Sequence, residues 1–326
     1  MASTEMRNLI IMMKKMMERG FGAKFDGDLD PNQLRSVIEL AQGNMPLEPG
    51  VRIEKEKFGG MDAELAVPED PREDALIIYI HGGGLVCGNA GTSRGYTSLL
   101  AAETRIPTYA FSYRLAPENP YPAAADDCIL AYEEIGKKNP GKSLILIGES
   151  GGAHLSVVTA LRARDRGLEP PACVIPYSVI LDWSGTIDRK REDCDDFTVT
   201  AAGLKALEDM YCPDESVRRD PYCSPYFADY TGMPPMLLAW DKTETLAPDN
   251  EILVRKLQDA GVEVQYKVYE GCFHAFSTTG KGTPESYEIL KDTAAFIDAH
   301  IGQQSRSGRP DGPASTESGG KHDHTG

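Results

Sequence analysis

Several common signatures are missing from this chain of 326 residues, and each absence narrows the class of protein. None of its seven cysteines stands in a CxxC pair, so neither a zinc site nor a disulfide framework is indicated. No apolar run approaches the roughly 18 residues that a membrane-spanning helix needs, so we expect no stable membrane insertion. The chain also lacks a GxGxxG motif and a P-loop lysine, which disfavours a phosphate-binding loop.

Basic residues are scarce relative to acidic ones. The chain holds 34 Lys and Arg against 50 Asp and Glu, a net charge of −16. Nucleic acids and anionic membrane surfaces are polyanions, so this balance disfavours both as partners. The N-terminal apolar run is short and ends at Lys14, with no small-residue cleavage site after it, so we predict no signal peptide. Unpaired cysteines suit a reducing compartment, and we expect a cytoplasmic protein.

What the chain does have is a regular alternation of apolar and amphipathic segments. Residues 5–45 read as two helices, and residues 50–67 as a hairpin that turns at Gly59 and Gly60. Beyond them, apolar stretches such as ALIIYI and SLILIG alternate with amphipathic helical stretches. Continuous apolar strands between such helices indicate an α/β fold with a mostly parallel central sheet flanked by helices.

Some segments fall outside this alternation and suggest a division of the chain. We predict an N-terminal helical cap segment at 1–48, a core at 49–302 and a disordered tail at 303–326, which has almost no apolar side chains. Residues 184–226 are polar and helical, so we interpret them as a second cap insertion within the core. The Met-rich stripe at residues 9–17 either packs on the core or forms an adaptable lid over an apolar pocket.

Ser150 stands in the pattern G-x-S-x-G, from Gly148 to Gly152. An apolar strand enters this pattern and a helix leaves it, which is the context of a nucleophile elbow. The flanking glycines lack Cβ and so leave room for a tight turn. We therefore expect the hydroxyl of Ser150 to be exposed above the carboxyl edge of the sheet, at the N-terminus of the following helix.

A glycine run, His81-Gly82-Gly83-Gly84, ends an earlier apolar strand. Adjacent glycines let backbone N–H groups approach a ligand closely. With no phosphate-binding motif present and a serine elbow nearby, an oxyanion hole is the better interpretation. We predict that Gly82 and Gly83 donate their N–H groups to the oxyanion from this loop, and that Gly151 donates its N–H from the turn after Ser150. Each donor is worth about 3 kcal/mol of transition-state stabilisation.

A serine hydroxyl is a weak nucleophile until a base takes its proton, and the chain has six histidines. Five are placed in the glycine loop, within or at the end of predicted helices, or in the tail: His81, His154, His300, His322 and His324. His274 lies in a loop directly after a strand, late in the chain. It fits the order serine, acid, histidine, so we predict His274 as the base.

Three motifs in order, HGGG, YRLAPENPYPAA and the G-x-S-x-G of Ser150, resemble those of the hormone-sensitive-lipase-like esterases over about residues 50–300. This resemblance implies an α/β-hydrolase fold with a helical cap, hydrolysis of carboxylic esters, and no cofactor or metal. The chain departs from the family's usual residues at Glu149 and Gly151, where Asp and Ala are common.

Four carboxylates follow the apolar run PPMLLAW, and one of them should orient the ring of His274. In sequence order they are Asp241, Glu244, Asp249 and Glu251. Asp241 comes first but lies close to the end of the predicted strand. The family's acid is followed by any residue and then Leu, with the histidine about thirty residues later. Glu244 has that form, and His274 lies 30 residues after it. The resemblance therefore implies Glu244, with Asp241 as the alternative.

Together these residues predict a serine hydrolase that cleaves small-molecule esters of short to medium acyl chains through an acyl-enzyme. A narrow-specificity deacetylase is one alternative. A non-catalytic small-ligand receptor of the same fold is another, and the presence of both Ser150 and His274 argues against it. A related peptidase is disfavoured because no propeller repeats are found. The segment VEVQYKVYEG could serve as the edge through which two copies form a homodimer.

Overall fold

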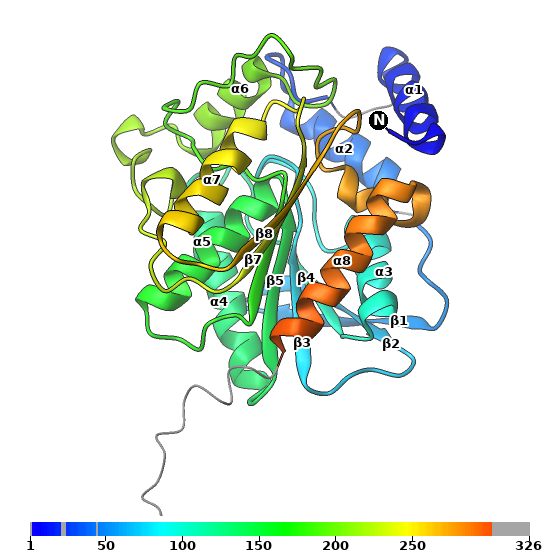
Figure 1. Cartoon of the computed structure of the whole chain (residues 1–326), viewed down its shortest axis with the longest axis vertical. Helices are drawn as coiled ribbons and strands as arrows, with labels where there is room; N and C mark the ends of the chain where they lie inside the picture. The colour runs from blue at the N-terminus through cyan, green and yellow to red at the C-terminus, as the bar shows by residue number, and fades with distance from the viewer. Residues whose placement is uncertain (1, 21–23, 44, 302–326) are drawn as a thin grey trace, which may run out of the picture.

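The computed structural model describes residues 2–20, 24–43 and 45–301, and its elements alternate as the sequence predicted (Figure 1). The strands are β1 (Val51–Phe58), β2 (Met61–Pro68), β3 (Ala75–Ile80), β4 (Thr108–Phe111), β5 (Ser143–Glu149), β6 (Cys173–Tyr177), β7 (Met236–Asp241) and β8 (Val264–Tyr269). The helices are α1 (Thr4–Glu18), α2 (Pro31–Gln42), α3 (Arg94–Thr104), α4 (Ala123–Lys138), α5 (Gly151–Asp165), α6 (Ala201–Tyr211), α7 (Ala247–Asp259) and α8 (Pro284–His300), with 3-10 turns η1 (Glu215–Val217), η2 (Pro225–Phe227) and η3 (Phe276–Gly282).

Within these described ranges the strands form one eight-stranded sheet in the order β1-β2-β4-β3-β5-β6-β7-β8. β2 is antiparallel to both of its neighbours, and every other neighbouring pair is parallel. The predicted α/β fold with a mostly parallel sheet is therefore confirmed. Because β3, β5, β6, β7 and β8 run in parallel, their carboxyl ends meet at one edge, and the predicted site residues follow four of these strands, β3, β5, β7 and β8.

Side chains of the central strands alternate between two cores, one on each face of the sheet. Ile78 and Leu146 belong to the core that includes residues of α4, α5 and α7. Ile77 and Ile147 belong to the core that includes residues of α3 and α8. Both faces are covered, which explains why these strands read as continuous apolar runs rather than as alternating ones.

The predicted hairpin turns where expected. β1 and β2 pair from Val51 opposite Pro68 to Phe58 opposite Met61. Between them Gly59 and Gly60 have φ of 54° and 87°, the left-handed conformation that a two-residue hairpin loop favours.

The two predicted N-terminal helices are present, but the Met-rich stripe of α1 is not a single buried face. Met6 is fully buried, and Leu9 and Met13 pack beside it. Met12 and Met16 are 52% and 41% exposed. A helix that touches the protein along one line buries one row of side chains, so the neighbouring row faces solvent. The prediction that the whole stripe packs on the core is thus wrong for Met12 and Met16.

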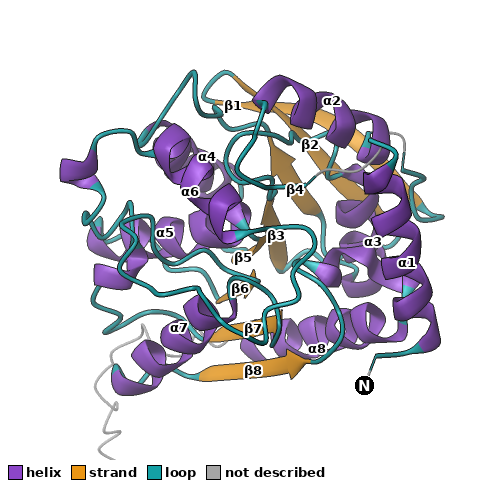
Figure 2. Cartoon of the chain, turned by 90° about the horizontal axis from the view of Figure 1, so that it is seen from above, coloured by secondary structure: helices purple, strands orange, loops and turns teal. Residues whose placement is uncertain are grey.

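Helices α1, α2 and α6 lie toward the top of Figure 1, and Figure 2 shows α1 at the side of the molecule, beside α8. The N-terminal segment is bonded to residues of the 184–226 region: the N–H of Phe25 donates to the carbonyl of Thr198 at 2.7 Å, and the N–H of Thr200 donates to the carbonyl of Phe25 at 2.8 Å. The predicted tail at 303–326 lies outside the described residues. No helix in the described ranges is long and apolar enough to span a membrane.

Candidate active site

The turn between β5 and α5 places Ser150 in a strained conformation, with φ 55° and ψ −120°. A Cβ at Gly152 would lie 1.9 Å from the carbonyl oxygen of Ile80, and a Cβ at Gly148 would lie 2.4 Å from that of Gly152. Only glycine fits at these two positions. The turn therefore has the shape that a nucleophile elbow requires, with Ser150 at the N-terminus of α5.

His274 and Glu244 lie next to each other in two loops that follow β8 and β7. The Nδ1 of His274 is 3.7 Å from Oε2 of Glu244, an ion-pair distance that is longer than a hydrogen bond. Neither ring nitrogen of His274 has a hydrogen-bond partner among the described residues, so Ser150 is not bonded to it here. Catalytic hydrogen bonds are often long in unliganded sites and shorten when substrate binds.

The end of β6 connects the three predicted residues. The N–H of Ser150 donates to the carbonyl of Tyr177 at 2.9 Å. The next residue, Ser178, donates its hydroxyl to Oε2 of Glu244 at 2.9 Å and accepts the N–H of Ala275 at 3.2 Å. Ser178 thus ties the acid to the loop of His274. No predicted role was attached to Ser178, although a hydroxyl directly after a buried parallel strand is a signal that the sequence offers.

The alternative acid, Asp241, is engaged in bonds that shape the loops. Its Oδ1 accepts the N–H of Thr243 at 2.9 Å, and its Oδ2 accepts the N–H of Cys272 at 2.7 Å. Asp249 is buried and ion-paired with Arg189, and Glu251 is exposed. Of the four carboxylates after β7, Glu244 is the one that lies beside His274.

Burial and charge act in opposite directions on this pair. Burial alone would lower the pKa of His274, but Glu244, with Asp196 and Glu149, outweighs it, so the pKa of His274 is raised above its ordinary value. Burial raises the pKa of Glu244 as well, although His274 opposes that shift. The role of Asp196 was not predicted. Its Oδ2 accepts the N–H of Thr245 at 3.0 Å, and nothing in its acidic stretch marked it in the sequence.

The glycine loop after β3 requires a correction to the predicted oxyanion donors. The N–H of Gly82 donates to Oε1 of Glu149 at 2.7 Å, so it is not free to bind a substrate oxygen. The N–H groups of Gly83 and Gly84 bond to none of the described residues, and the Gly84 nitrogen lies 3.3 Å from where a Cβ of Gly151 would stand. The N–H groups of the glycine loop that remain unbonded among the described residues are therefore those of Gly83 and Gly84. The prediction of Gly82 as a donor was wrong because the sequence does not show which N–H is already bonded.

Two histidines near the site serve the structure. The ring of His81 stacks on Tyr113 with centroids 4.2 Å apart, and its Nδ1 lies 2.8 Å from the carbonyl of Gly82. Burial lowers the pKa of His81 to about 4 and that of His154 to about 3, so both are neutral near pH 7. His154 bonds the carbonyl of Ile180 through Nδ1 at 3.1 Å.

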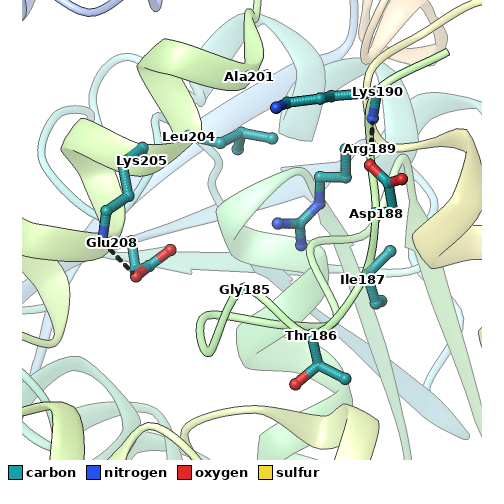
Figure 3. A pocket seen from close by; sticks show the side chains of 10 residues that line it. All are labelled: Gly185, Thr186, Ile187, Asp188, Arg189, Lys190, Ala201, Leu204, Lys205 and Glu208. Carbon is teal, nitrogen blue, oxygen red and sulfur yellow. Dashed lines mark hydrogen bonds and ion pairs between the residues drawn. The ribbon is translucent and has the colours of Figure 1, made fainter.

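Figure 3 shows a separate pocket of about 320 Å³ between residues 185–190 and α6. Arg189 points into it, and Lys205 and Glu208 form an ion pair of 2.8 Å on its wall. None of Ser150, Glu244 and His274 lines this pocket. Arg189 also holds Asp249 at 2.6 Å, so it fixes the 184–226 region to the helix that follows Glu244.

Within the described ranges, the cysteines and other ligand-type side chains form no further site. All seven cysteines are unpaired, and six of them are buried. Across the part of the chain that the structure describes, no group of three or more His, Cys, Asp and Glu side chains is arranged to hold a metal ion.

Comparison with known proteins places this geometry in a family context. Residues 77–278 match the family model described as alpha/beta hydrolase fold. An esterase of Acinetobacter venetianus is 31% identical over 82% of this chain and 89% of its own length. An acetyl-hydrolase of Streptomyces hygroscopicus is 27% identical over 93% and 99%. The crystal structure of a hormone-sensitive lipase from a metagenome library superposes with a TM-score of 0.80 at 29% identity, covering 89% of this chain and 98% of that one.

The assignment of the acid can be tested without a substrate, through covalent labelling of Ser150 by a fluorophosphonate. Replacing Glu244 with Gln removes the charge that supports protonated His274, so we expect labelling to slow by about 10³- to 10⁴-fold. Asp241→Asn, the matched control, should change the rate by less than about tenfold. Rates are compared per folded molecule, and the reverse ranking would exclude Glu244 as the acid.

The pH dependence of the same labelling gives a second test. His274 must be neutral to accept a proton, so the rate should rise with pH through the pKa of His274. That pKa is raised, so the inflection should lie above the ordinary value of about 6.5. In Glu244→Gln it should move to lower pH, because the neighbouring negative charge is gone. An inflection in the unchanged chain below 6.5 would contradict the geometry.

Proposed function

We propose that this chain cleaves esters of short to medium acyl chains through Ser150, His274 and Glu244. The chain belongs to the α/β-hydrolase family and is a carboxylesterase of the hormone-sensitive-lipase-like type. The observation that carries the assignment is the strained turn of Ser150 beside the free N–H groups of Gly83 and Gly84. A tight turn of this kind has no structural need for a serine, whereas a nucleophile needs both the turn and the donors.

The proposed reaction follows from the positions of the groups. His274 takes the proton of the Ser150 hydroxyl as its oxygen attacks the ester carbonyl, and Glu244 stabilises the imidazolium through Nδ1. The negative charge on the former carbonyl oxygen is met by the N–H groups of Gly83, Gly84 and Gly151. His274 then gives its proton to the leaving alcohol. A water molecule attacks the acyl-enzyme by the same steps and releases the acid.

The side chains around the glycine loop favour a small acyl group. At Gly84 a Cβ would lie 2.7 Å from Leu207 and 3.3 Å from Phe25, and at Gly151 it would lie 3.3 Å from Leu85. Three bulky apolar residues therefore pack against the glycines of the proposed oxyanion site. Phe25 comes from the N-terminal segment and Leu207 from the 184–226 region, which supports the proposal that 1–48 and 184–226 form a cap over the core. The acetyl-hydrolase relative agrees with a short acyl preference.

We also propose that the chain is cytoplasmic and forms a homodimer. Its unpaired, mostly buried thiols suit a reducing compartment and support a cytoplasmic location. β8 lies at the edge of the sheet, and Tyr266 and Val268 on it are 49% and 48% exposed. Such an edge suits pairing with a second copy.

If the chain is a homodimer, its molar mass in solution is twice the 35.6 kDa of one chain. Light scattering coupled to gel filtration measures that mass. Val268→Arg should shift that mass to the monomer, because a charged side chain on the edge opposes pairing. Leu40→Arg, at a more exposed apolar residue of α2, is the control and should leave the mass unchanged. A monomeric unchanged chain would contradict the dimer.

Chain-length preference is tested with initial rates on p-nitrophenyl acetate, butyrate, octanoate and palmitate, with Ser150→Ala as the blank. We expect Ser150-dependent rates that are greatest for the shorter acyl groups and lowest for palmitate, because of the crowded site. A rate for acetate alone would favour the narrow deacetylase. If none of these esters is turned over, fluorophosphonate labelling of Ser150 would favour a hydrolase of narrow specificity, and a lack of labelling would favour the small-ligand receptor.

A further inference from the structure

A carboxylate stands directly before the nucleophile, and the mechanism above does not use it. Glu149 is the last residue of β5. Its Oε1 accepts the N–H of Gly82 at 2.7 Å, and its Oε2 accepts the hydroxyl of Tyr79. Tyr79 is buried in β3, the strand that leads into the glycine loop. Glu149 therefore connects the serine turn to the oxyanion loop at its first glycine.

We propose that Glu149 is a positioning residue for the oxyanion hole, which it holds by anchoring the Gly82 N–H while Gly83 and Gly84 point theirs at the substrate. This inference rests on the proposed ester hydrolysis and names a residue that acts through other groups.

The directions of the Gly83 and Gly84 N–H groups follow from the carbonyl groups that precede them. In a trans peptide the N–H points away from the preceding carbonyl. The carbonyl of Gly82 faces Nδ1 of His81, which directs the N–H of Gly83 to the opposite side. The carbonyl of Gly83 accepts the N–H groups of Val86 and Cys87, both at 3.1 Å, which does the same for the N–H of Gly84.

The directions of these two N–H groups depend on how the first peptide of the glycine run is held. Gly83 and Gly84 have φ of 100° and 61°, and glycine has the largest conformational freedom of any residue. The bond from Gly82 to Glu149 fixes the first peptide of the run, and with it the direction of the two that follow. Space is tight there as well, since a Cβ at Gly82 would lie 2.9 Å from both the backbone carbonyl and Oε1 of Glu149.

The charge of Glu149 reaches the base. The carboxylate of Glu149 is bonded by Tyr79 and by the N–H groups of Gly82 and of Glu149 itself. Tyr96, Tyr113 and His274 also interact with it electrostatically. Part of the residue is exposed, but protein atoms surround the carboxylate, and burial raises the pKa of Glu149 to about 7. When ionised, Glu149 adds to the charges that raise the pKa of His274.

The test is steady-state hydrolysis of p-nitrophenyl acetate by the full chain, with rates expressed per Ser150 site titrated by a fluorophosphonate. Glu149→Ala removes the anchor, so we expect kcat to fall about 10- to 100-fold while KM changes less than about threefold. Glu149→Asp, which keeps the acceptor on a shorter side chain, should recover part of the loss. Glu251→Gln, an exposed carboxylate on α7, is the matched control and should leave kcat unchanged.

Two further readouts separate positioning from a role in folding alone. A trifluoromethyl ketone forms an oxyanion adduct with Ser150, and Glu149→Ala should weaken its affinity by about the same factor as kcat/KM. Glu149→Gln keeps an acceptor for the Gly82 N–H but loses the charge, so the acidic limb of its kcat/KM profile should move to lower pH.

The outcomes distinguish the two proposals. Fewer titratable sites in Glu149→Ala, with normal kcat per site and normal ketone affinity, would overturn the positioning role. An unchanged chain without Ser150-dependent turnover would remove the proposed function. Ketone affinity would then still decide whether Glu149 shapes the oxyanion loop, because the adduct forms without turnover.

Discussion

The close approach of the serine turn to the end of β3 is the contact on which the rest of the site depends. No side-chain atom fits at Gly152, where a Cβ would lie 1.9 Å from the carbonyl of Ile80. This contact brings the N-terminus of α5 against the glycine loop that follows β3. The proposed oxyanion hole depends on it, because its donors come from both segments.

A second junction, at the end of β6, brings His274 and Glu244 to the same edge. Asp241 and Ser178 are short polar side chains at the ends of neighbouring strands, and each bonds the loop that carries His274. Glu244 is then held by the hydroxyl of Ser178 and by His274. Buried polar groups of this kind are costly unless they are paired, so the bonds that hold the loops also keep the acid in place.

The sequence was most informative where a pattern is local. The strand–turn–helix around Ser150, the hairpin at Gly59 and the alternation of strands and helices all follow from nearest neighbours along the chain. It was less informative where a group has a choice of partners. Gly82 and Gly84 are identical in sequence terms, yet Glu149 occupies the N–H of Gly82 and leaves that of Gly84 free. In the same way, Met12 and Met13 of α1 differ in exposure because of what α1 packs against.

By itself, the sequence determined the α/β class and the position of the strand–turn–helix around Ser150, because glycine placement and apolar periodicity act over a few residues. The prediction of Glu244 came from the resemblance to a family. The tertiary structure alone decided which N–H groups are free, that Asp241 bonds backbone while Glu244 meets His274, and that Ser178, Asp196 and Glu149 support the site. Those outcomes depend on contacts between residues tens of positions apart, and the geometry of such contacts exists only once the sheet has formed.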